Sequence, residues 1–106
     1  IVTTPEGAVR KLALLKNKFK KMLTKGVKIT VYTTLSDEVK QAAKDFKGLT
    51  LKALTSIDSR FVLVDSKDVV FMVSDDKNIH ESYDTGIWVN TPYFVHSLET
   101  MLKSLE

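Results

Sequence analysis

Short segments with a two-residue apolar period alternate along this chain with segments of helical period. Residues 27–33 alternate apolar and polar side chains, as a half-buried strand does. Residues 1–3 resemble the end of a strand, and four further segments have strand character: 49–54, 60–64, 69–74 and 86–90. This order predicts a single α/β domain in which helices flank a mixed sheet.

Two Thr-Pro pairs mark the predicted starts of helices. Thr4-Pro5 and Thr91-Pro92 each supply an N-cap hydroxyl and a first-turn proline. The first helix is expected to continue to Lys25, with Gly26 as its left-handed C-cap. Leu14 lies opposite the apolar stripe of this helix, so it is either a lone exposed leucine or a contact for a partner.

The remaining segments complete the predicted domain. Ser36 opens a middle helix that Gly48 closes, and the polar residues 65–68 join two strands into a hairpin. Residues 75–85 are polar and acidic, which predicts a surface loop. The apolar face of the last helix is expected to consist of Phe94, Val95, Leu98, Met101, Leu102 and Leu105.

Positive charge is concentrated in the first half of the chain. The net charge is +3, yet residues 1–53 hold 12 Lys or Arg against 4 Asp or Glu, and residues 54–106 hold 4 against 9. This asymmetry fits a nucleic-acid face, a self-complementary interface or simply a solvated lysine face.

The composition also excludes several classes of protein. No apolar run approaches the roughly 18 residues of a membrane span, so no membrane partner is expected. The absence of cysteine excludes disulfides and thiolate metal sites and favours a cytoplasmic location. Neither His80 nor His96 has metal-ligand spacing, and the four glycines stand singly, so neither a metal nor a cofactor is predicted.

Residues 58–65, DSRFVLVD, have the spacing of a phosphodiesterase motif without its catalyst. Phospholipase D-type enzymes carry His-x-Lys-x4-Asp, and here the three positions hold Asp58, Arg60 and Asp65. An aspartate in the place of the histidine nucleophile would repel a phosphodiester anion, so no catalytic residue is predicted. Arg60 and Asp65 either serve in a ligand pocket or pair with each other or with Asp58.

Three stretches together resemble the phospholipase D-like domain of archaeal TrmB-type transcriptional regulators. They are TTPEGAVRKLALLKNKFKKMLTKGVKITVYT, SRFVLVDSKDVVFMVSDD and TGIWVNTPYFVHSLETML, and the resemblance covers nearly the whole chain. It implies a phospholipase D-like mixed sheet flanked by helices, formed by residues 1–106 as one effector and dimerisation domain. In that family an N-terminal winged helix-turn-helix binds the promoter. This chain lacks such a segment and is expected to be a fragment of a longer protein.

The resemblance implies a non-catalytic regulatory domain that forms a homodimer and responds to a small effector, such as a sugar or another metabolite. DNA would be bound through the missing winged helix-turn-helix. Four residues on recurring positions of the motifs are the candidate effector-binding residues: Arg60, Asp65, Trp88 and Asn90. Trp88 either packs in the core or walls a pocket, and its β-branched neighbours favour the core.

Two other functions remain open from the sequence. One is a divergent phosphodiesterase or nuclease of the phospholipase D type that completes its site across a dimer. The other is a purely structural protein-interaction domain that binds no effector.

Overall fold

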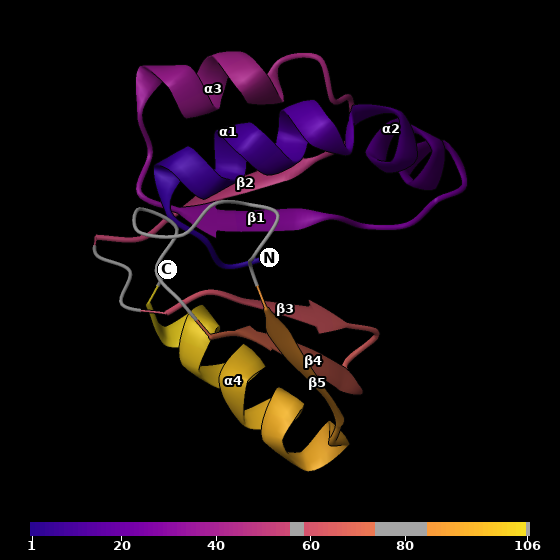
Figure 1. The fold of residues 1–106 in the computed structure, drawn as a ribbon, viewed down its shortest axis with the longest axis vertical. Coiled ribbons are helices and arrows are strands. Elements are labelled where there is room, and N and C mark those ends of the chain that lie inside the picture. Colours follow the sequence, from indigo (N-terminus) through magenta and orange to yellow (C-terminus); the bar gives the residue numbers. More distant parts are fainter. Residues whose placement is uncertain (56–58, 74–84, 106) are drawn as a thin grey trace.

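The elements follow the predicted order, except that the first helix is divided in two. The computed structural model describes residues 1–55, 59–73 and 85–105. The predicted loop 75–85 therefore lies almost entirely outside the described residues, as do Asp58 and His80. The elements, shown in Figure 1, are α1 (Pro5–Leu14), α2 (Lys16–Thr24), β1 (Thr30–Thr33), α3 (Asp37–Ala43), β2 (Thr50–Ala53), β3 (Phe61–Val64), β4 (Asp68–Met72), β5 (Gly86–Asn90) and α4 (Pro92–Ser104).

Residues 1–3 join two sets of strands into one ladder. β1 pairs in parallel with β2, while β4 pairs antiparallel with both β3 and β5. Val2 bridges Tyr32 in parallel and Phe61 in antiparallel orientation. The Val2 N–H donates to the Phe61 carbonyl at 2.8 Å, and the Tyr32 N–H donates to the Ile1 carbonyl at 2.7 Å. The order across the mixed sheet is therefore β2, β1, residues 1–3, β3, β4 and β5.

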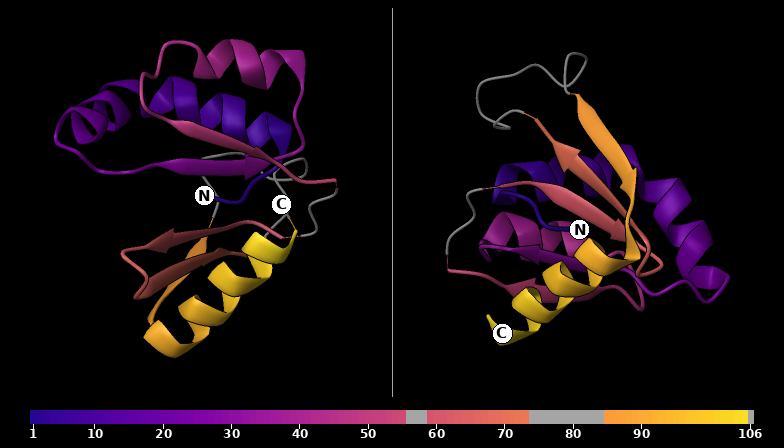
Figure 2. Two further views of the ribbon diagram at one scale, coloured as in Figure 1. Left: turned by 180° about the vertical axis from the view of Figure 1, so that it is seen from behind. Right: turned by 90° about the horizontal axis from the view of Figure 1, so that it is seen from below.

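The helices cover opposite faces of the two halves of this sheet. Figures 1 and 2 show α1 and α3 above β1 and β2, α2 beyond the ends of these strands, and α4 beneath β3, β4 and β5. Because side chains alternate along a strand, Val31 faces the first group of helices while Tyr32 packs toward α4. The first core contains Ala8, Leu12, Phe19, Ile29, Val31, Val39 and Phe46; the second contains Val2, Leu54, Phe61, Val69, Val95 and Leu102.

The predicted helix starts are confirmed by their caps. The Gly7 N–H donates to Thr4 Oγ1 at 3.1 Å, and the Val39 N–H donates to Ser36 Oγ at 3.2 Å. Thr91 Oγ1 likewise accepts from a backbone N–H of the first turn of α4, at 3.4 Å. No helix of the described segments is long and apolar enough to cross a bilayer.

The prediction of one continuous helix to Lys25 is wrong, because Leu15 interrupts it with φ −106° and ψ 18°. A straight 20-residue helix is about 30 Å long, whereas the four-residue strands beneath it extend about 13 Å. The break returns α2 toward the core, where Phe19 packs edge-on against Phe46 with ring centroids 6.4 Å apart. Leu14 is 64% exposed, on the side opposite this core.

In a chain that begins at Ile1, burial of the free amino group makes stability depend on pH. Ile1 donates to the Thr30 carbonyl at 2.9 Å. Desolvation lowers the pKa of this amino group from 8.0 to about 6, and the charge of Lys11 adds to the effect. Between these values the unfolded chain binds more protons than the folded chain, so the folded state becomes more stable as pH rises.

For a chain that begins with the free amino group of Ile1, we expect the free energy of unfolding to increase by up to about 3 kcal/mol from pH 6 to pH 8. Urea unfolding across this range measures it. The control carries a Gly-Ser extension before Ile1, which replaces the amine with a peptide N–H that still reaches Thr30 but does not titrate. Equal pH dependence of the two chains would contradict this assignment.

Candidate functional site

The four sequence-predicted site residues do not converge on one place. Arg60 precedes β3 and Asp65 follows it, so the two lie at opposite ends of this strand. Trp88 is at the middle of β5, and Asn90 is at its end, beside the turn that follows β3. Of the four, only Asp65 lines the cleft described below.

Arg60 is buried. It is 4% exposed, and its carbonyl accepts from the Met72 N–H at 3.0 Å. A guanidinium taken out of water requires polar partners, and Arg60 is engaged in such interactions. This burial leaves little of its charge accessible to a ligand from solution.

A left-handed turn fixes Asp65 and its neighbour against α4. Asp65 and Ser66 have φ of 53° and 57°, and the Lys67 N–H donates to the Val64 carbonyl at 3.1 Å. Two successive left-handed residues are typical of the tight turns that match the twist of a hairpin. Ser66 Oγ then donates to Glu99 Oε2 at 3.0 Å, so this turn is tied to the middle of α4.

A cleft of about 650 Å³ lies between this turn, α4 and the segment that leads into β1. It combines apolar side chains with charges of both signs, and its volume is in the usual range for small-molecule sites. Its lining residues are Ile1, Val2, Gly26, Val27, Lys28, Thr30, Tyr32, Leu63, Asp65, Ser66, Glu99, Leu102 and Lys103. This hairpin cleft is the candidate ligand site of the described chain.

Glu99 is a charged cleft residue that the sequence interpretation missed. It lies four residues after the buried Val95 and three before the buried Leu102, so the helical period places it on the inward side of α4. In the structure the Glu99 carboxylate is half-buried. A carboxylate at an inward-facing helical position can be recognised from the sequence as a candidate site residue, because charged residues rarely face a core.

Asn90 forms a structural contact. Its Nδ2 donates to Asp68 Oδ1 at 2.8 Å, across the register pair that joins the ends of β4 and β5. The bond fastens the exposed edge strand to its neighbour.

Trp88 is 68% exposed, so the expectation that it packs in the core is wrong. It stands on the face of β5 opposite α4, next to Val70. The helices that cover this face of the sheet, α1 and α3, lie over β1 and β2 instead (Figure 1). The alternation of residues along β5 places Trp88 on one face of the sheet. It does not indicate whether a helix covers that face.

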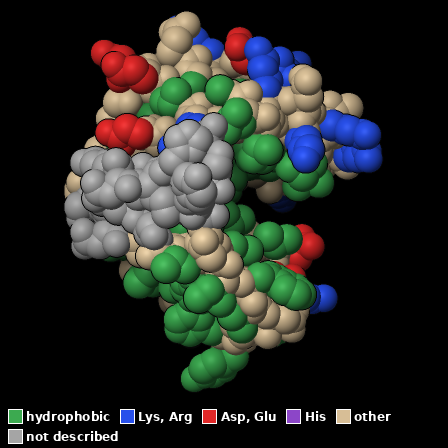
Figure 3. Space-filling view, in the orientation of Figure 1, with side chains coloured by type: hydrophobic (Ala, Val, Ile, Leu, Met, Phe, Trp, Pro, Cys, Tyr) green, Lys and Arg blue, Asp and Glu red, His purple; other side chains and the backbone are tan. Residues whose placement is uncertain are grey.

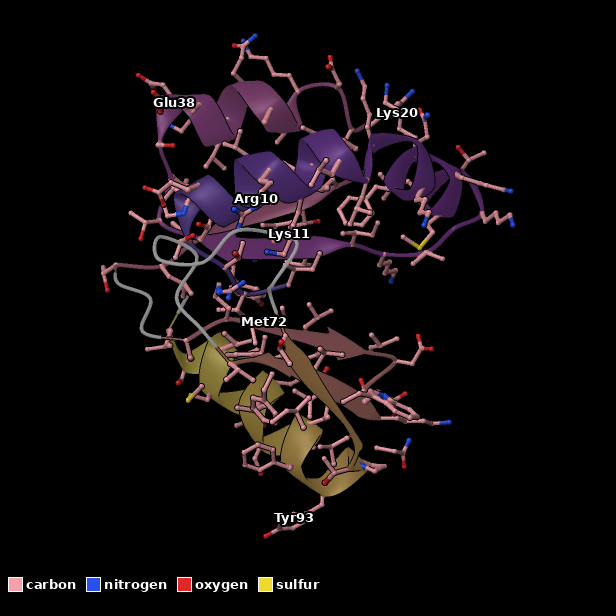
Figure 4. All side chains as sticks on the ribbon, viewed as in Figure 1. Arg10, Lys11, Lys20, Glu38, Met72 and Tyr93 are labelled. Atoms are coloured by element: carbon pink, nitrogen blue, oxygen red, sulfur yellow. The ribbon has the colours of Figure 1, made fainter. Side chains whose placement is uncertain are left out.

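Trp88 belongs to a group of exposed apolar residues around the edge strand β5, with Trp88 on one face and Ile87, Val89 and the start of α4 on the other. We call this the association surface and define it as Ile87, Trp88, Val89, Tyr93 and Phe94, whose exposures are 55%, 68%, 39%, 87% and 44%. Tyr93 points away from the body of the molecule in Figure 4, and many hydrophobic side chains lie on the lower half in Figure 3. Met101 and Leu105 continue the exposed apolar residues along α4.

Basic side chains gather elsewhere, around α2. Lys16, Lys18, Lys20 and Lys21 are exposed on this helix, and Figure 3 shows blue side chains in the upper half of the molecule. No group of three metal-ligating side chains occurs among the described residues.

Comparisons with protein-family models, with curated proteins and with solved structures find no match for this chain. The resemblance to TrmB-type regulators therefore rests on the motifs alone.

Gly86 is required where β5 passes β4. A Cβ at this position would lie 2.9 Å from Val70 Cγ1 and 3.3 Å from Met72 Sδ. We therefore expect Gly86→Ala to lower the free energy of unfolding by about 1–3 kcal/mol, through overpacking. Denaturant unfolding measures it. The control Asn90→Ala, at the other end of β5, removes one exposed hydrogen bond and should lower the free energy of unfolding by less than about 1 kcal/mol. A smaller loss for Gly86→Ala than for this control would contradict the steric requirement for glycine.

Proposed function

We propose that this chain is the non-catalytic dimerisation domain of a TrmB-type DNA-binding transcriptional regulator, with a phospholipase D-like fold. The association surface carries this proposal. Its exposed apolar side chains lie on both faces of one edge strand, and exposed apolar surface of this kind marks interaction sites. A regulator that binds two half-sites requires a two-fold partner, which a domain of this kind supplies.

The residues at the three positions of the phosphodiesterase motif support a non-catalytic role. Asp58 stands in the sequence position of the nucleophile. Arg60, in the position of the phosphate-binding lysine, is buried. An enzyme of the phospholipase D type needs an accessible nucleophile and an accessible cation at the phosphate.

We expect the chain to sediment as a dimer, at twice the 11.9 kDa of one copy, in equilibrium ultracentrifugation at micromolar concentration. Leu14→Lys changes an exposed leucine on α1, outside the association surface, and should leave the dimer intact. A monomer at all accessible concentrations would overturn the proposal. The regulatory assignment is tested separately by reading the parent gene upstream of Ile1, where a winged helix-turn-helix is expected.

The hairpin cleft is the proposed effector site of this domain. A ligand that binds only the folded state raises the melting temperature by mass action. We expect at least one compound of a panel of sugars and central metabolites to do so. Glu99→Gln should weaken the response by removing one cleft charge, whereas Glu38→Gln, on α3 and outside the hairpin cleft, should not. The absence of any shift would favour a purely structural interaction domain.

A further inference from the structure

We propose that two copies of this chain pair along the free edge of β5, antiparallel and with the two-fold axis at Trp88, so that one sheet continues through both. This inference rests on the proposed dimerisation and names its geometry. Within the described residues β5 pairs only with β4, and all five of its residues are exposed. Among these residues, no strand lies along its outer edge.

The hydrogen bonds to β4 fix which backbone groups face outward. The Val73 N–H donates to the Thr85 carbonyl at 2.9 Å, and the Thr91 N–H donates to the Lys67 carbonyl at 2.8 Å. Residues of an antiparallel strand bond alternately to one side and the other, so odd-numbered residues 85–91 bond to β4. Gly86, Trp88 and Asn90 accordingly direct their N–H and C=O groups to the open edge.

This set of outward groups is self-complementary about its centre. With the axis at Trp88, the two Trp88 residues exchange both backbone bonds, and Gly86 of each copy pairs with Asn90 of the other. The pairing forms about six backbone hydrogen bonds. A strand that can bond to its own copy in this way satisfies the row of backbone groups that a sheet edge presents.

The side chains match in the same register. The two Trp88 side chains become direct cross-strand neighbours on one face, while Ile87 of each copy lies opposite Val89 of the other on the second face. β5 has no charged residue, so the pairing brings no like charges together. β2, at the other edge of the described sheet, carries Lys52 in its middle, and an edge lysine is a common means of preventing such pairing.

The largest exposed apolar side chains supply about half of the area that a standard dimer interface needs. At about 200 Å² per side chain, the exposed parts of Trp88, Tyr93 and Phe94 amount to about 400 Å². This is about half of the roughly 800 Å² that each partner contributes to a standard interface. Phe94 extends the surface onto α4, because its ring packs 5.8 Å from that of Phe71, the β4 neighbour of Ile87.

The unaltered protein provides the first test, because Trp88 is the only tryptophan. We expect its fluorescence to shift to shorter wavelength as protein concentration rises, with the same midpoint as the monomer–dimer transition measured by sedimentation. A dimer whose formation leaves the emission unchanged would overturn the pairing at β5 while leaving the dimerisation proposal intact. A monomer would overturn both.

Substitutions then test the geometry. The chain contains no cysteine, and Cα atoms of a hydrogen-bonded pair are about 5.5 Å apart, within disulfide range. Trp88→Cys should therefore form a disulfide-linked dimer under mild oxidation. Tyr93→Cys, which is more exposed but lies far from the axis, should not. Equal cross-linking of the two variants would overturn the proposed register.

Trp88→Lys places two like charges across the axis and should raise the dimer dissociation constant at least about 30-fold. Leu14→Lys adds the same charge at a residue of similar exposure and should leave the constant unchanged. Circular dichroism confirms that each variant is folded. If the folded Trp88→Lys protein dimerises as tightly as the control, the pairing at β5 is wrong.

Discussion

The insertion of residues 1–3 between β1 and β3 is the interaction on which the rest of the structure depends. Four backbone hydrogen bonds join Ile1, Val2 and Thr3 to Tyr32 on one side and Phe61 on the other. Val2 is buried in the core under α4, whereas Ile1 packs against the core under α1. Without this segment, β1 with β2 and β3 with β4 and β5 would be two separate small sheets, and each would lose a neighbouring strand. One short segment therefore couples the two halves of the domain.

Local signals predicted most of the fold. The Thr-Pro pairs placed the starts of α1 and α4, and the sequence boundaries of β5 agree with the structure. The break at Leu15 was not predictable, because the apolar stripe runs through it without interruption; the short sheet beneath, not the helix sequence, limits the length of α1. β1 is also shorter than the apolar period indicated, since strand pairing begins only at Thr30. These errors concern elements whose ends are set by distant partners.

The candidate site was less predictable than the fold. Arg60 and Asp65 are close in sequence, but a strand separates them in space, and a left-handed turn carries only Asp65 to the cleft. Trp88 has the neighbours of a core residue, yet the helices that could cover it lie over the other half of the sheet. Strand periodicity assigns a side chain to a face of the sheet, whereas burial depends on which helix crosses that face. That choice is made by connections between elements, which single residues do not encode.

The basic side chains and the association surface lie in different parts of the molecule, so the proposed self-association is compatible with a net positive charge. Two copies that each carry a net charge of +3 repel one another at long range. The exposed lysines of α2 belong to the upper half of the molecule and the association surface to the lower half (Figure 3). With a longest dimension of 34 Å and a Debye length of about 8 Å at physiological salt, much of the repulsion between the two basic regions is screened in a dimer joined at β5. The basic helices then remain exposed on both copies, on the far side of the paired strands. The hairpin cleft lies on the α4 side of the sheet and has no residue of β5 in its lining, so the proposed pairing edge and the proposed ligand site are separate parts of the sheet.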